Sequence, residues 1–139
     1  MKFDNKYTDF ENNETELTEK ELEWFYSVVT KFHQLPEATG IVIVNRNHEE
    51  LSRKNREAYG IFWTTDPNDI KSDSFITIDN FFIHEMYDVV FNGAFNVAFE
   101  TLEGCIAHEI AHRYKFRHCK THSNITNEIL EKYYSLRGV

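Results

Sequence analysis

The fold is organised around one stretch of the chain, His108-Glu109-Ile110-Ala111-His112. In an α-helix, positions i and i+4 lie one turn apart on the same face, roughly 40° from each other. The two histidines can therefore share one metal ion, and the pattern H-E-x-x-H is typical of a zinc-binding helix. Glu109 lies about 100° from His108 around the helix. We expect its carboxylate to reach a water on the metal, which is the position of a general base.

The flanking residues predict a buried amphipathic helix over about 97–116. Its apolar residues form one stripe, between about 120° and 200° from His108 around the helix, and they are Phe99, Leu102, Ile106 and Ile110. Small residues lie beside the histidines and leave room for a ligand: Gly104, Ala107 and Ala111.

A catalytic zinc site needs a third protein ligand and one open position. The next histidine is His118, which would lie too far along an unbroken helix to join the other two. We therefore predict that the helix ends near Phe116, that the chain turns back, and that His118 is the third ligand. No Gly or Pro marks the turn, so His122 and Glu128 remain alternatives.

The run from His108 to His118 reads HExxH, five residues and a further His. It resembles the zinc site of the small SprT-like and minimal-gluzincin metallopeptidases, in which a short turn and a run H-[GS]-K-x-[FW] close the site. The closing run here is His118-Cys119-Lys120-Thr121-His122, in which the Lys matches, the Gly or Ser is Cys119 and the aromatic position is His122. An alternative registration places His122-Ser123 on the His-Ser pair.

The metzincins share the same three-His spacing, but their Gly before the turn is Lys115 here and no Met-turn follows. The resemblance to the SprT-like and gluzincin enzymes covers about 58–134 loosely and 108–118 specifically. It implies a zinc ion held by His108, His112 and a later His, with Glu109 as general base.

Composition and length limit the classes of protein that fit. A chain of 139 residues with 41% hydrophobic and 15% aromatic residues is long enough for one domain with a modest core. The net charge of −8 disfavours nucleic acid as a partner. No apolar run approaches the roughly 18 residues of a membrane span, and the N-terminus lacks the apolar stretch of a signal peptide. We expect a cytoplasmic protein with a flexible N-terminus over 1–15 and a single zincin-like metallopeptidase domain over 16–139.

The two cysteines do not form a disulfide framework. Cys105 is expected to be a small buried residue of the metal helix. Cys119 is an alternative thiolate ligand.

The remaining elements predict an α+β domain with a small twisted sheet of three to four strands. A capping box, Thr18-Glu19-Lys20-Glu21, begins an amphipathic helix that ends before Pro36. Strands are expected at 40–45, 58–65 and 74–79, with a turn at 66–69 that makes the last two a hairpin. A surface loop or short helix at 48–57, a loop and short helix at 81–95 that includes His84 as a surface or packing residue, and a last helix at 124–136 complete the prediction.

The predicted function is hydrolysis of peptide bonds in a peptide or protein substrate by a zinc-bound water, with Glu109 as general base. Ser74–Asp79 is our candidate for an edge strand that captures the substrate by backbone hydrogen bonds. Tyr133 and Tyr134 could donate to an oxyanion, although packing is the favoured role for both. The alternative is a non-catalytic, zinc-stabilised protein-binding module on the same scaffold. The sequence does not indicate the oligomeric state.

Overall fold

The computed structural model of the chain describes residues 5–9, 11–48, 59–94 and 101–136. Within these ranges the protein is a small α+β domain with a two-stranded and a three-stranded sheet, which confirms the predicted fold class. The helices are α1 (Glu19–Phe32), α3 (Asn80–Asn92), α4 (Leu102–Ala111) and α5 (Lys120–Ser135), with a 3₁₀ turn η1 (Pro36–Ala38). The strands are β1 (Lys6–Thr8), β2 (Glu14–Glu16), β3 (Ile41–Arg46), β4 (Gly60–Thr64) and β5 (Ser74–Asp79).

The three-stranded sheet has the order β3-β5-β4. β5 pairs in parallel with β3 and antiparallel with β4, so the predicted β4–β5 hairpin is confirmed. The prediction that Ser74–Asp79 is an edge strand is wrong, because this strand lies at the centre of the sheet. Its alternate faces are both covered, with Ile76 and Thr77 each fully buried, and a strand buried on both faces belongs inside a sheet.

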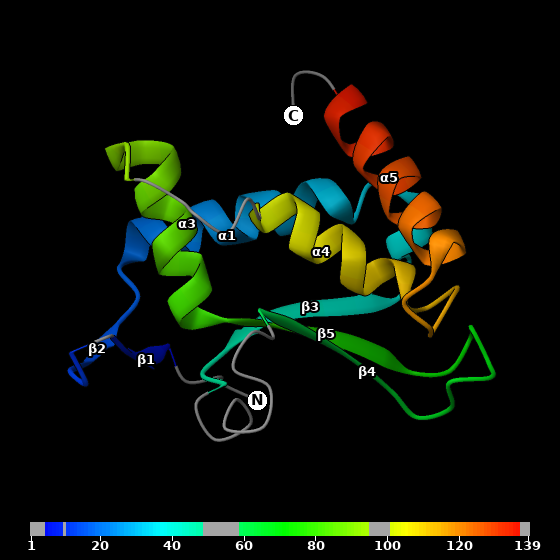
Figure 1. Cartoon of the computed structure of the whole chain (residues 1–139), viewed down its shortest axis with the longest axis horizontal. Helices are drawn as coiled ribbons and strands as arrows, with labels where there is room; N and C mark the ends of the chain where they lie inside the picture. The colour runs from blue at the N-terminus through cyan, green and yellow to red at the C-terminus, as the bar shows by residue number, and fades with distance from the viewer. Residues whose placement is uncertain (1–4, 10, 49–58, 95–100, 137–139) are drawn as a thin grey trace.

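The helices α1 and α4 lie on the same side of this sheet (Figure 1). One apolar core joins them to it, and its members include Phe25 and Phe32 of α1, Ile106 and Ile110 of α4, and Ile43, Ile76 and Ile78 of the sheet. The last helix, α5, packs against α4. Tyr133 of α5 is 4% exposed and its ring stacks on Phe32 at 4.3 Å between centroids, which confirms the packing role of this tyrosine.

The N-terminal part of the chain contains a hairpin that the sequence did not predict. β1 and β2 pair antiparallel inside the segment expected to be flexible, and Tyr7 is the buried residue of the hairpin. The predicted capping box of α1 is present, with Thr18 and Glu21 each bonded to the other's backbone. Glu21 also contacts His84 of α3, with 2.6 Å between Oε2 and Nδ1, and Tyr7 stacks on the same ring, so His84 is a packing residue as predicted.

Two other predictions change in detail. α3 is a helix of 13 residues capped by Asp79 rather than a loop with a short helix. His48 was expected at the surface, but it is 1% exposed and its Nε2 lies 3.0 Å from the Thr77 hydroxyl oxygen. Residues 49–57 of that predicted loop lie outside the described residues.

Among the described helices, none combines the length and the hydropathy that a membrane span requires.

Candidate metal centre

Helix α4 carries His108 and His112, but it is shorter than predicted. It begins after Thr101, whose extended backbone and hydroxyl, accepting from the Gly104 N–H at 2.9 Å, form an N-cap. It ends at Ala111, so that His112 is the C-cap residue. The predicted end near Phe116 is therefore wrong, and the predicted segment 97–100 lies outside the described residues.

The turn that follows α4 is held by contacts with distant parts of the chain. The Arg113 guanidinium donates to the carbonyl of Ile70 at 2.9 Å and to the carbonyl of Thr39. The Tyr114 hydroxyl donates to the carbonyl of Glu37 at 2.7 Å. These bonds tie the turn to the η1 region and to the β4–β5 loop, and they reverse the chain so that α5 returns alongside α4.

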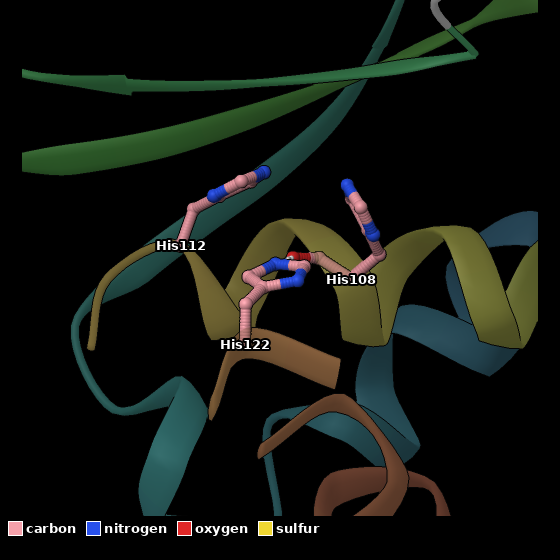
Figure 2. Close-up of side chains that lie close together, drawn as sticks. All are labelled: His108, His112 and His122. Carbon is pink, nitrogen blue, oxygen red and sulfur yellow. Dashed lines mark hydrogen bonds between the residues drawn. The ribbon is translucent and has the colours of Figure 1, made fainter. Parts of the chain in front are cut away.

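This reversal brings three histidines together: His108, His112 and His122, whose ligand atoms all lie within 4.8 Å of one another. Figure 2 shows the first two rising from α4 and His122 entering from the first turn of α5. The His122 ring centroid is 4.4 Å from that of His108 and 4.2 Å from that of His112. The group can hold a metal ion, and His122, an alternative in the sequence analysis, is its third member.

Hydrogen bonds to carbonyl oxygens determine which ring nitrogens face the centre. His122 Nε2 lies 2.9 Å from the His108 carbonyl, and His112 Nδ1 lies 3.3 Å from the Lys115 carbonyl. A carbonyl only accepts, so these nitrogens carry the protons, and His122 Nδ1 and His112 Nε2 keep lone pairs. A carbonyl partner behind a histidine is the usual support of a metal ligand. The donor set therefore fits zinc, which prefers imidazole nitrogen.

His118, the predicted third ligand, lies next to this group but not in it. Its Nε2 is 3.1 Å from His108 Nε2, and its ring centroid is 4.7 Å from that of His112 and 5.4 Å from that of His122. The structure thus brings four histidines together, and ligation by His118 stays a prediction. Glu128 lies on the exposed side of α5 and does not belong to the group.

Burial controls the charge of the two histidines on α4. Loss of water around the rings, followed by the neighbouring histidines, lowers the pKa of both His108 and His112 from 6.5 to about 4. Both side chains are consequently neutral near pH 7 without metal. Neutral imidazole is the form that binds a metal ion.

The carboxylate of Glu109 is held between α4 and the sheet. Glu109 is 7% exposed, and its Oε2 lies 3.9 Å from His108 Nε2. Gly60 of β4 lies directly over it, because a Cβ atom at Gly60 would stand 3.0 Å from both Glu109 Cγ and Cys105 Sγ. Gly60 was not among the predicted site residues, although glycine inside a strand often marks a close approach of another element.

The two cysteines have separate environments. Cys105 is buried and free, as predicted for a packing residue. Cys119 is also free and caps the N-terminus of α5, where the backbone N–H of His122 lowers the pKa of the thiol. Its sulfur is not a member of the three-ligand group.

A pocket of about 230 Å³ opens beside the histidines. His108, His118 and His122 form one part of its lining, and α5 also contributes the uncharged polar residues Ser123, Thr126 and Asn127.

Comparisons of the chain with known protein families, with curated proteins and with solved structures find no match. The site must therefore be interpreted from its own chemistry.

Proposed function

We propose that the protein is a zinc-dependent metallopeptidase. One observation carries the proposal: a buried carboxylate, Glu109, adjoins a group of three histidines that can hold a metal ion. His108, His112 and His122 would hold the zinc. When bound there, zinc would supply Lewis acidity that lowers the pKa of a water and polarises a carbonyl.

Glu109 has the role of the general base. Its carboxylate adjoins His108 but points from the next position along the helix, which leaves it within reach of a water at the centre rather than in the ligand set. With zinc bound, Glu109 would take a proton from that water and would pass it to the leaving amine. Burial between α4 and β4 restricts the carboxylate to few positions, so that orienting it for the reaction costs little entropy.

An extended peptide would bind along β4. Among the described residues β4 pairs only with β5, so its other edge has backbone groups available for an added strand. This edge belongs to the strand whose Gly60 touches the Glu109 side chain. Strand addition is a common way to bind peptides without strong side-chain specificity. We therefore propose unfolded or extended protein segments as the substrate class.

The experiment compares wild-type protein with Glu109→Gln and His122→Ala for zinc content and hydrolysis of casein. We expect one zinc per chain in wild type and in Glu109→Gln, with a rate at least about 100-fold lower in Glu109→Gln because general-base catalysis is lost. His122→Ala should lose zinc. Glu103→Gln, a carboxylate on the same helix, is the matched control and should retain the wild-type rate. Absence of zinc from the wild-type protein would refute the proposal.

A zinc-stabilised binding module is the second candidate, and the contact between His118 and His108 is the observation that favours it. Four histidines on one zinc leave no position for a reacting water. In that case zinc would be bound by wild type and by Glu109→Gln, and neither protein would hydrolyse casein.

A further inference from the structure

We propose that His118 is a detachable fourth ligand of the metal centre, which fills the remaining coordination position at rest and leaves it when substrate binds. The proposal rests on the proposed function, because it describes how access to the same site is regulated. The proposal rests on the position of the His118 ring, on the absence of an outer partner behind that ring among the described residues, and on the pocket into which the freed position opens.

The position of the His118 ring fits a metal ion shared with His108. His118 Nε2 lies 3.1 Å from His108 Nε2. For Zn–N bonds of about 2.0–2.1 Å at tetrahedral angles, two ligand nitrogens are about 3.3 Å apart. The ring centroids of His108 and His118 are 5.0 Å apart, so the two Nε2 atoms lie closer to each other than the ring centres do. The two Nε2 atoms are therefore close enough to bind one metal ion.

The support behind His118 differs from that behind His112 and His122. His112 and His122 each donate from the second ring nitrogen to a backbone carbonyl. Within the described parts of the chain, His118 has hydrogen-bonding and ring contacts with the other three histidines only. Loss of an outer partner typically weakens metal binding by about 10- to 100-fold. His118 should therefore leave more easily than His112 or His122, and it differs from His108 because it does not lie on α4.

The backbone around His118 also permits exchange. His118 is exposed and lies in the connection between α4 and α5, whereas the other three histidines belong to a helix or its cap. The start of this connection is anchored by Arg113 and Tyr114, so movement is confined to the part beyond them. On release one dative bond breaks, and its electron pair stays on the imidazole nitrogen. The freed position opens onto the pocket beside Ser123, Thr126 and Asn127.

The test uses Co²⁺ in place of zinc, because its visible spectrum reports the ligand set independently of catalysis. Wild type, His118→Ala and His118→Gln are loaded with one equivalent of Co²⁺ and titrated with azide as an external ligand. Arg117→Ala is the matched control, since it lies in the same connection and is equally exposed. Substitution of an exposed residue should leave the fold intact, and the far-ultraviolet circular dichroism verifies this.

We expect Co²⁺ to bind to all four proteins. Azide should change the spectra of His118→Ala and His118→Gln at a concentration at least about tenfold lower than that needed for wild type and Arg117→Ala. This factor corresponds to an open state populated to about 10% in wild type. Equal azide responses would overturn the proposal, and so would loss of Co²⁺ from both His118 variants, which would make His118 an indispensable ligand.

Hydrolysis of casein separates the two proposals. If the peptidase assignment is correct, His118→Ala should be faster than wild type at low substrate concentration. If no variant hydrolyses casein while azide binds selectively to the His118 variants, the peptidase assignment fails and the detachable ligand stands. If all variants hydrolyse casein at the same rate and bind azide alike, the detachable ligand fails alone.

Discussion

Replacement of Gly60 by alanine tests whether the spacing between β4 and α4 controls the site. The added Cβ would lie 3.0 Å from Glu109 Cγ, 3.0 Å from Cys105 Sγ and 3.1 Å from Ile78 Cδ1. Three contacts this short cannot all persist, so β4 and α4 must separate by a few tenths of an ångström. Gly60 does not have a positive φ, so crowding is the whole effect.

The magnitude follows from this crowding. Adding a methyl group to a well-packed interior costs about 1–3 kcal/mol, and about 2 kcal/mol in a domain of this size lowers Tm by roughly 8 °C. Glu109 is moved at the same time, and a displacement near 1 Å of a catalytic group costs up to about 100-fold in rate. A displacement of a few tenths of an ångström should therefore lower the rate of casein hydrolysis by about 5- to 50-fold. The zinc content should stay unchanged.

Urea denaturation, zinc analysis and casein hydrolysis are measured on the same preparations. Gly93→Ala is the control, because Gly93 has φ +69° and, among the described residues other than its chain neighbours, no atom would lie within 4 Å of an added Cβ. It should lose about 1 kcal/mol through backbone strain and keep full activity. Cys105→Ala in the Gly60→Ala background removes one of the three contacts and should restore part of the stability. Wild-type stability and rate in Gly60→Ala would refute the close packing of β4 on Glu109.

Two further predictions concern charge and the turn. Burial raises the pKa of the Asp79 carboxyl to about 6. Between about pH 4 and 6 the carboxyl is therefore protonated in the folded state and ionised in the unfolded state. The stability of the fold consequently falls as the pH rises through that window. Asp79→Asn keeps the helix cap and should raise the free energy of unfolding by up to about 3 kcal/mol at pH 7 and leave it unchanged at pH 3.5. Urea denaturation at both pH values measures this, and equal stabilisation at both would contradict the raised pKa of Asp79. Arg113→Ala should weaken zinc binding about tenfold in a chelator competition, because the turn between the ligands loosens, whereas Arg117→Ala should not; equal affinities in both variants would argue against the anchoring role.

Patterns within single segments could be predicted from the sequence. The capping box at Thr18 and the strand Ser74–Asp79 depend on residues only a few positions apart, and both are present as predicted. The metal helix follows the same rule, because His108 and His112 are adjacent on one face of any helix. These local rules account for α1, the β4–β5 hairpin and two of the three clustered histidines.

The third ligand depended on contacts that no local pattern contains. The chain turns after Ala111 because Arg113 and Tyr114 bond to carbonyls of Thr39, Ile70 and Glu37, far away in the sequence. A signal for His122 did exist, since it lies on the same helical face as Ile129 and Tyr133, the other buried residues of α5. A histidine on an apolar stripe that faces a zinc motif is well placed to join it.

The order of the strands in the sheet could not be predicted from the sequence either. Whether Ser74–Asp79 lies at the edge or the centre is decided by its parallel pairing with β3, which a hairpin pattern cannot indicate. The near-continuous burial of this strand, with Ser74, Ile76, Thr77 and Ile78 all buried, is the mark of its central place.

The histidines of the site are close together in the chain, and this affects how strongly metal binding can stabilise the fold. Nine residues, 113–121, separate His112 from His122, so closing this loop in an unfolded chain costs little entropy. If the site binds zinc as proposed, the unfolded chain would also retain an affinity for the ion, and the gain in folding free energy would be smaller than the affinity of the folded site alone would give. A newly synthesised chain would then be able to bind zinc as soon as α4 and the start of α5 have emerged, before the rest of α5 has packed.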